Sequence, residues 1–436
     1  MTRSVHLRRT LPACLAAVTA AAVAGGVLVL APTDASAAPG GKGNPHTRNV
    51  IFINGDGMSA AHREAARLAQ VGYDGDLVMN TLGATGLQTT DPDDVNDTIT
   101  DSAAAASAWA TGVKTYNGAI SVANAPVGGK DAPGRALLTL GKEAKDAGKA
   151  TGIVTTAQVT DASPAAFFSN TANRSNQDDI ARQYLEVTRP DVILGGGEDW
   201  WLPAGTPGAF PDNPPEDPAE ASRGTKGDLV GRAKQLGYTY VTSRSQLQRA
   251  TGDKLLGLFA NEEMFQQRPE GAGDVYTPVV PLPEMTRKAL DIVSRDKDGF
   301  FLLVEEEGVD EFAHDDNGAR MLQSMKYLED TVRLARDYVQ AHPDTLLVVT
   351  GDHDCGGLSI EGPDTGDENG APGISGEDGP FTIPGDSRTF VMDWTTAGHT
   401  GVPTVVTGAG YGSEQLVGYY PNTHLHEVMH RVLFGR

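Results

Sequence analysis

The sequence has little cysteine and little positive charge. Its 436 residues include two cysteines, and 35 basic residues stand against 57 acidic ones, so the formal net charge is −22. An acidic surface repels the backbone of nucleic acids, which excludes nucleic acid as a surface-bound partner. The mean hydropathy of −0.29 excludes a polytopic membrane protein. Anions can bind such a chain only where metals or single arginines reverse the local field.

The N-terminus resembles an export signal. Arg3, Arg8 and Arg9 precede an uncharged stretch over residues 11–31, and an Ala-Ser-Ala site follows at 35–37. This order predicts a signal peptide over residues 1–37, cleaved during secretion, with a short linker at 38–48. The general secretory route is favoured over twin-arginine export, and no stable membrane anchor is expected after cleavage. A single anchoring helix is the alternative, which the prolines and glycines of this stretch disfavour.

Cleavage at this site would make the charge balance more extreme. It removes three basic residues and one acidic residue, which brings the net charge to −24, and it removes Cys14. Cys355 is then the single cysteine of the exported chain. An internal disulfide is excluded, so the fold has to rest on its core and on metals.

Apolar runs alternate with helical patterns along the rest of the chain. Strands are predicted at 49–54, 152–155, 191–194, 300–305, 345–350 and 404–407, and helices at 60–70, 136–147 and 321–340. Such alternation predicts an α/β fold, a largely parallel central sheet flanked by helices. Residues 49–436 are read as a single domain with surface insertions at about 201–224, rich in Pro and Gly, and at about 361–387, which has seven acidic residues and no basic one.

Carboxylates and histidines follow three of the predicted strands. Asp56 follows the first, Glu305 closes the strand predicted at 300–305, and Asp352 with His353 follows the run at 345–350. In open α/β sheets, ligands bind beyond the carboxyl ends of the strands. Each residue alone is more simply a turn former, but together they form the oxygen and nitrogen set that zinc and magnesium prefer.

Further candidates lie close to these in sequence. Asp310 and His314 are four residues apart, which places them on one helix face, and His399 stands in a Gly-His-Thr-Gly loop. The purely structural alternative for Asp310 and His314 is an ordinary ion pair along a helix. Ser102 precedes an alanine run and is the candidate nucleophile, because a helix N-terminus favours anions. The purely structural alternative is that Ser102 caps the N-terminus of the helix.

Seven ordered blocks resemble the alkaline phosphatase family, bacterial secreted or periplasmic type. They are TDSAAAASAWATGVKTYNG at 100–118, GDGM at 55–58, DASPAA at 161–166, LGGG at 194–197, VEEEGVD at 304–310, TGDH at 350–353 and GHTG at 398–401. The resemblance covers the chain from about residue 49 to its end. It implies a three-layer sandwich and a phosphomonoesterase that works through a phosphoseryl intermediate.

The resemblance also implies a site with three metals. The first zinc would be held by Asp310, His314 and His399, and the second by Asp56, Asp352 and His353 with Ser102 completing it. A third metal, usually magnesium, would be shared by Asp56, Ser163 and Glu305. Arg174 would clamp the phosphate, while Asp101, Asp161 and Glu311 would bind substrate or lie just outside the metal ligands. Dimers are common in the family, so a homodimer is a candidate assembly.

Two departures from the family pattern bear on specificity. Glu311 stands where the best-known bacterial enzyme has lysine and animal enzymes have histidine, and a carboxylate there would repel phosphate or attract a further cation. Ser163 stands where some members have threonine, which preserves a hydroxyl ligand. These departures leave the identity of the third metal open.

Other activities remain as alternatives. A phosphodiesterase would use the same metals, and a narrow phosphatase acting outside the cell, for example on an aminoglycoside phosphate, would suit the acidic surface. A sulfatase is disfavoured because alanines follow Ser102. A phosphate or metal binder would not need that serine. His426 and His430 form an HExxH motif typical of zinc proteases, but a C-terminal helix with a core-facing apolar side is the simpler interpretation.

Overall fold

The computed structural model describes residues 48–210, 221–363 and 377–435. The predicted signal peptide lies outside the described residues, as do nearly all of the predicted linker and a part of each predicted insertion, 211–220 and 364–376. Among the described residues, no helix is both long and apolar enough to cross a membrane.

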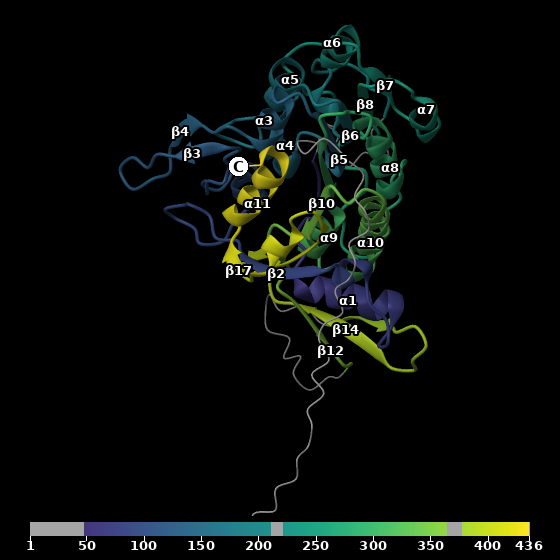
Figure 1. Cartoon of the computed structure of the whole chain (residues 1–436). Coiled ribbons are helices and arrows are strands. Elements are labelled where there is room, and N and C mark those ends of the chain that lie inside the picture. The colour runs from purple at the N-terminus through teal and green to yellow at the C-terminus, as the bar shows by residue number, and fades with distance from the viewer. Residues whose placement is uncertain (1–47, 211–220, 364–376, 436) are drawn as a thin grey trace, which may run out of the picture. The chain divides into compact units, whose positions relative to one another are not determined.

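A ten-stranded sheet forms the centre, in the order β17-β2-β16-β10-β1-β9-β5-β6-β8-β7 (Figure 1). Only β16 runs antiparallel to its neighbours, and all other adjacent pairs are parallel. The strands are β1 Asn49–Gly55, β2 Ala84–Thr89, β5 Ala150–Gln158, β6 Val192–Gly196, β7 Thr239–Val241, β8 Leu255–Leu258, β9 Phe300–Glu306, β10 Thr345–Thr350, β16 Thr404–Gly410 and β17 Gly418–Pro421. The predicted α/β class and all six predicted strands are confirmed.

Helices cover both faces of this sheet (Figure 1). One face packs against α1 Ala60–Val71, α7 Arg244–Arg249, α8 Leu282–Val293, α9 Gly308–His314 and α10 Gly318–Ala341. The other packs against α2 Ser102–Thr111, α3 Leu140–Asp146, α4 Ala162–Phe168, α5 Gln177–Gln183, α6 Leu229–Gln235 and α11 Thr423–Phe434. The arrangement is the three-layer sandwich that the resemblance implied.

Burial on both faces explains the apolar strand sequences. In β1, Ile51 and Ile53 belong to the core on one side of the sheet, and Val50 and Phe52 belong to the core on the other. Successive side chains of a strand point to opposite faces. A parallel strand covered on both faces therefore needs apolar residues at every position, and reads as an unbroken apolar run.

One predicted boundary is wrong. The helix expected over 136–147 begins only at Leu140, where the Thr139 side chain caps it. Residues 133–136 instead form strand β4 Pro133–Ala136, which pairs with β3 Val122–Asn124. Pairing with the preceding strand β3 thus overrides the helical pattern at Ala136.

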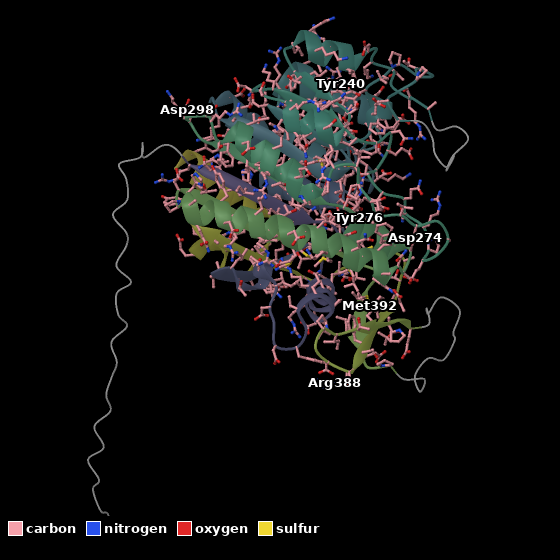
Figure 2. The ribbon with its side chains drawn as sticks, turned by 90° about the vertical axis from the view of Figure 1, so that its right-hand side faces the viewer. Tyr240, Asp274, Tyr276, Asp298, Arg388 and Met392 are labelled. Carbon is pink, nitrogen blue, oxygen red and sulfur yellow. The ribbon has the colours of Figure 1, made fainter. Side chains whose placement is uncertain are left out.

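Besides the pair of β3 and β4, two more small sheets accompany the main one. β11 Asp354–Cys355 pairs with β15 His399–Thr400. A three-stranded sheet is formed by β12 Leu358–Glu361, β13 Asp378–Thr382 and β14 Thr389–Trp394, and Figure 2 labels Met392 within it and Arg388 just before it. The predicted insertion at about 361–387 therefore supplies one whole strand of a sheet.

The contact between β1 and two helices generates a stability prediction. The Phe52 ring lies 5.0 Å from that of Trp109 in α2 and 5.7 Å from that of Phe167 in α4, measured between ring centroids. We expect Phe52→Ala to lower the free energy of unfolding by about 3–5 kcal/mol, because it removes a buried aromatic side chain and leaves a cavity. Urea denaturation followed by circular dichroism measures the change.

The control for this experiment is Val127→Ala, since that side chain is 73% exposed. Its effect should stay below about 0.5 kcal/mol. If the two substitutions cost the same, the core between β1 and these helices is not packed as described.

Candidate active site

Three neighbouring strands bring the predicted acidic residues to one edge of the sheet. β10, β1 and β9 are adjacent, and Asn54 of β1 lies level with Thr350 on one side and with Glu305 on the other. Asp56 follows β1 and Asp352 follows β10 by two residues. The convergence predicted from the strand ends is therefore present in the structure.

The predicted ligands of the first metal lie together. The His314 Nε2 is 3.1 Å from Asp310 Oδ2, and the His399 Nε2 is 3.7 Å from Asp310 Oδ1. Each histidine places its other ring nitrogen, Nδ1, against a backbone carbonyl, of Ala397 at 2.8 Å and of Thr100 at 2.9 Å. A carbonyl accepts a hydrogen bond, so Nδ1 carries the proton and Nε2 keeps its lone pair for a metal.

His353 stands at the centre of the predicted second set. Its Nε2 is 3.2 Å from Asp352 Oδ2, 3.6 Å from Asp56 Oδ1 and 3.1 Å from the Ser102 Oγ. Burial, followed by the neighbouring His399, lowers the pKa of His353 well below its usual value. The ring is therefore neutral, as a metal ligand must be.

The two predicted zinc sets are in direct contact. The rings of His353 and His399 stack with centroids 3.5 Å apart, and His353 Nδ1 is 3.7 Å from Asp310 Oδ1. Possible ligand atoms fall into two groups, each with all its atoms within 4.8 Å of one another. One group is Asp56, Asp310 and His353, and the other is Asp310, His314, Cys355 and His399. Cys355 was not among the predicted ligands.

Asn54 connects the predicted ligands of the third metal. Its side-chain Nδ2 donates to Glu305 Oε1 at 3.3 Å and to Ser163 Oγ at 3.4 Å. Thr155 donates to the other oxygen of Glu305 at 2.7 Å. Asn54 and Thr155 were not predicted as site residues, although both are polar residues near the end of an apolar strand sequence, which was the available signal.

Three buried carboxylates of this site each have one oxygen without a hydrogen-bond partner among the described residues. Asp56 Oδ1, Asp310 Oδ1 and Asp352 Oδ2 are buried, and no described group donates a hydrogen bond to any of them. Burial, and then the charges of Asp352, Asp310 and Glu305, raise the pKa of Asp56 well above its usual value. Uncompensated buried charge is unfavourable, so this oxygen and nitrogen set fits bound cations.

Ser102 is the first residue of helix α2, and Asp101 is the N-cap. The Asp101 carboxylate accepts from the backbone N–H of Ala104 and of Gly118, both at 2.9 Å. The N-cap reading therefore belongs to Asp101, which leaves the Ser102 hydroxyl at the positive end of the helix dipole.

Arg174 lies beside this helix start. Its Nη2 is 2.7 Å from Asp161 Oδ1, and its Nη1 is 3.5 Å from Asp101 Oδ2. Its backbone N–H donates to the Gly118 carbonyl at 2.8 Å. Two carboxylates thus orient a guanidinium near the predicted nucleophile.

Glu311 belongs to an acidic group with Asp161, Glu263 and Glu307. Burial, and then Asp310 and Glu263, raise the pKa of Glu311 to about 8. Glu307 is 5% exposed, its Oε2 has no hydrogen-bond partner among the described residues, and it faces the other three carboxylates. Glu263 and Glu307 were not predicted, because their proximity depends on distant segments.

Thr156 holds the two unpredicted residues in place. Its hydroxyl accepts from the Glu307 N–H at 3.0 Å, and its carbonyl accepts from the Met264 N–H at 2.9 Å. The residue preceding Met264 is Glu263, whose carboxylate accepts from Gln158 at 2.6 Å. Hydrogen bonds from the carboxyl end of strand β5 therefore hold both glutamates in place.

The HExxH residues are built into a packed helix. Leu425, Val428, Met429 and Leu433 of α11 are buried, as predicted. His430 Nε2 is 3.1 Å from Glu143 of α3, and neither histidine joins a possible metal-ligand group in the described part of the chain.

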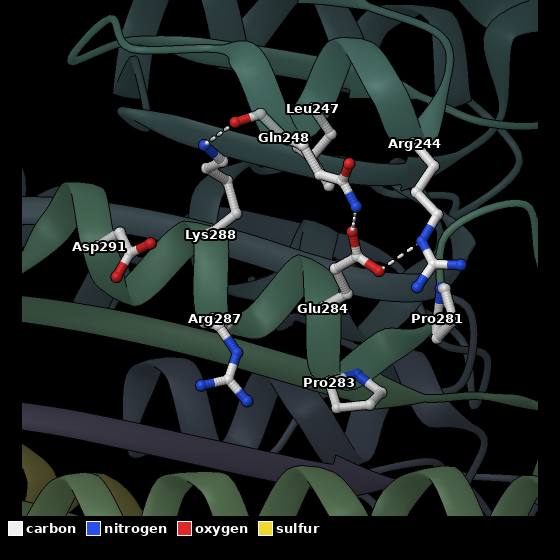
Figure 3. Close-up of a pocket in the computed structure, with 9 residues that line it drawn as sticks. All are labelled: Arg244, Leu247, Gln248, Pro281, Pro283, Glu284, Arg287, Lys288 and Asp291. Atoms are coloured by element: carbon white, nitrogen blue, oxygen red, sulfur yellow. Dashed lines mark hydrogen bonds and ion pairs between the residues drawn. The ribbon is translucent and has the colours of Figure 1, made fainter.

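A cavity of about 570 Å³ lies away from this site, between α7 and α8 (Figure 3). Its lining includes Arg244, Glu284 and Arg287 and none of the predicted site residues. Glu284 is occupied there by Arg244 at 2.6 Å and by Gln248 at 2.8 Å. This cavity is therefore separate from the carboxylates and imidazoles gathered at the sheet edge.

Comparisons with known proteins point to one family. A family model described as alkaline phosphatase matches residues 47–382. Alkaline phosphatase 4 of Bacillus subtilis is 34% identical over 72% of this chain, and streptomycin-6-phosphate phosphatase of Streptomyces griseus is 33% identical over 92% of this chain and 93% of its own length. The match covers 62% of the length of the B. subtilis protein.

A solved structure agrees in fold. The cold-active alkaline phosphatase of a psychrophilic Shewanella species superposes with a TM-score of 0.71 at 29% identity, covering 88% of this chain and 99% of that one.

The acidic edge predicts how pH affects the protein without metals. Burial is the main cause that raises the pKa of Glu305 to about 7 and that of Asp352 to about 6, above reference values of 4.5 and 3.8. The folded state therefore keeps protons that the unfolded chain releases, so the contribution of these two groups to stability is highest below about pH 4 and falls until about pH 7. With a chelator present, we expect the thermal midpoint to fall by several degrees between about pH 5 and about pH 8.

Zinc and magnesium should abolish most of that decline, because bound cations stabilise the ionised carboxylates. Glu305→Gln should flatten the metal-free profile, since it removes one of the groups responsible. A metal-free midpoint that rises over the same range would contradict the role given to these carboxylates.

Proposed function

This chain belongs to the alkaline phosphatase family, and we propose that it hydrolyses phosphate monoesters through a phosphoseryl intermediate on Ser102. The observation that carries the proposal is the position of the Ser102 hydroxyl. It lies at the N-terminus of α2, 3.1 Å from His353 Nε2, within the group of carboxylates and imidazoles that suits cations. Phosphoryl transfer is mostly positioning and charge stabilisation, which this arrangement supplies.

The ligand assignment follows the residues that lie together. Asp310, His314 and His399 would hold one zinc, Asp56, Asp352 and His353 a second, and Asp56, Ser163 and Glu305 a magnesium. When bound, two such zinc ions lower the pKa of the serine hydroxyl and stabilise the charge on the attacking and leaving oxygens. The unpartnered oxygens of Asp56, Asp310 and Asp352 support this assignment.

The side chains of the protein perform the remaining steps. Ser102 Oγ attacks the phosphorus, the alcohol leaves on the opposite side, and water then cleaves the phosphoserine to release inorganic phosphate. Arg174, oriented by Asp101 and Asp161, grips two non-bridging oxygens, a bidentate task for which lysine is a poor substitute. The dipole of α2 stabilises the developing negative charge.

The predicted signal peptide places this activity outside the cytoplasm. Residues 1–37 would be removed during secretion, and phosphate esters in the surroundings would be the substrates. A homodimer remains the predicted assembly.

Turnover of three ester types tests the proposal. The purified protein should hydrolyse a phosphate monoester such as p-nitrophenyl phosphate at least about 100-fold faster than the matching phosphodiester or sulfate ester, because only the dianionic monoester satisfies Arg174 and the metals together. A chelator should abolish the activity and zinc with magnesium should restore it. Preference for the diester would favour a phosphodiesterase, and activity that survives chelation would overturn the metal assignment.

Ser102→Ala should reduce kcat for the monoester by at least about 1,000-fold, since it removes the nucleophile. The matched control is Ser245→Ala, an exposed serine of α7, which should leave kcat unchanged. Mass spectrometry of protein quenched in acid during turnover should find phosphate on the peptide that contains Ser102. Full turnover by the Ser102→Ala variant would instead leave a phosphate or metal binder with a different active group.

The second candidate function is a phosphatase of narrower specificity, which prefers phosphate esters whose leaving group carries positive charge. The acidic group of Asp161, Glu263, Glu307 and Glu311 favours it, because burial and mutual repulsion raise the pKa of Glu307 and Glu311, and a positive group of the substrate beside them would favour their ionised forms. The Streptomyces griseus relative is named for dephosphorylating streptomycin 6-phosphate, which supports a related extracellular substrate such as an aminoglycoside phosphate.

Two sugar phosphates that differ by one ammonium group test this preference. We expect kcat/KM for glucosamine 6-phosphate to exceed that for glucose 6-phosphate, and Glu311→Gln to reduce the ratio by about five-fold, the value of one charge contact in water. Glu414→Gln, an exposed glutamate outside the acidic group, is the control. Equal kcat/KM for both sugars in the unmodified protein would favour broad specificity.

A further inference from the structure

Cys355 lies among the residues assigned to the first metal. Its side chain is fully buried. The Cys355 Sγ, a nitrogen each of His314 and His399, and a carboxylate oxygen of Asp310 all lie within 4.8 Å of one another. The family resemblance assigned no role to this position, and the mechanism proposed above does not use it.

The backbone fixes Cys355 in this position. β11 pairs with β15 so that Cys355 lies directly opposite His399. The Cys355 N–H donates to the Gly57 carbonyl at 3.1 Å. Gly57 has a φ of +65°, and a Cβ at this position would lie 2.5 Å from Asp310 Oδ1 and 2.9 Å from the Cβ of Cys355. Only glycine allows the backbone at position 57 to lie this close to both Asp310 and Cys355.

The thiol has no strong competing interaction in this position. It donates to the main-chain carbonyl of Asp310 at 3.6 Å, and a thiol is a weak donor. The thiol proton is engaged in this hydrogen bond. A zinc ion at this point would displace that proton to solvent and take the thiolate as ligand.

We infer that Cys355 Sγ is a fourth protein ligand of the first metal, together with Asp310, His314 and His399. This inference rests on the first-metal assignment made above. Zinc binds sulfur at about 2.3 Å and nitrogen at about 2.0 Å, so adjacent ligand atoms of a tetrahedral site are about 3.5 Å apart. The four atoms have to draw together by roughly 1 Å to reach that geometry.

A fourth protein ligand changes what the first metal site does. Four protein ligands would fill the tetrahedral set that zinc prefers, so a substrate oxygen would have to join as a fifth ligand. No oxidation is involved, because one S–H bond is exchanged for one metal–sulfur bond and the proton leaves to water. A thiolate also selects zinc over magnesium at this position, since magnesium prefers oxygen ligands.

Cobalt substitution tests the inference with a spectrum instead of an activity. The full chain carrying Cys14→Ser has Cys355 as its single thiol. After removal of metals, this protein is loaded with Co²⁺. Visible bands report cobalt bound at the sites formed by the carboxylates and histidines, and a near-ultraviolet thiolate-to-cobalt band reports the sulfur ligand. We expect both, and we expect Cys355→Ser added to this chain to lose the near-ultraviolet band while keeping the visible bands.

Other outcomes separate this inference from the proposed function. Visible bands without the near-ultraviolet band would overturn the cysteine ligand and leave the phosphatase proposal intact. No bands at all would overturn both the ligand and the metal assignment. Zinc absorption spectroscopy of the unmodified protein gives an answer that needs no variant, since a zinc–sulfur distance of about 2.3 Å is expected and its absence contradicts the inference.

Zinc affinity gives a second readout. Cys355→Ser should bind the first zinc at least about 10-fold more weakly in competition with a chromophoric chelator, because a hydroxyl replaces a thiolate. Cys355→Ala separates coordination from packing, as it should show the same loss. Unchanged affinity in both variants would show that sulfur does not bind the metal.

Discussion

Repulsion between buried carboxylates is the constraint on which this molecule depends. β10, β1 and β9 run parallel and in register, so Asp56, Glu305 and Asp352 reach the same edge of the sheet. Oxygens of Asp56 and Asp352 have no hydrogen-bond partner among the described residues. Such an edge is stable only when positive charge joins it, and the helices on both faces of the sheet prevent the carboxylates from turning to water.

A small set of hydrogen bonds connects this edge to the nucleophile. The His399 Nδ1 bonds to the Thr100 carbonyl, two residues before Ser102. Gly118 donates to Asp101 and accepts from the backbone of Arg174. A metal-ligand candidate, the nucleophile and the guanidinium are thus all attached to the stretch between residues 100 and 118. Positions fixed in this way cost little reorganisation during a reaction, which is how preorganised sites lower a barrier.

An anionic substrate is compatible with the negative surface of the protein because the acidic edge would hold cations. Cations held at the edge would make one positive pocket on an acidic protein, and Arg174 adds a positive group beside it. Burial and mutual repulsion raise the pKa of Glu263, Glu307 and Glu311, which stand next to that pocket. A cation beside them would favour their ionised forms, so the site suits a substrate with a phosphate at one end and a positive charge at the other.

The sequence by itself determined six of the ten strands of the main sheet and the types of residue that gather at its edge. The apolar strand sequences, the acidic residues that follow them, the Asp310–His314 spacing and the alanine run after Ser102 are all local patterns, set by burial and helix geometry. Only the tertiary structure decided which of these groups meet. It placed Cys355 opposite His399, brought Asn54 to Glu305 and Ser163, and gathered Glu263 and Glu307 beside Thr156. These contacts join segments that are far apart in the chain, and the burial that gives them their energies is a property of the folded molecule that no local pattern contains.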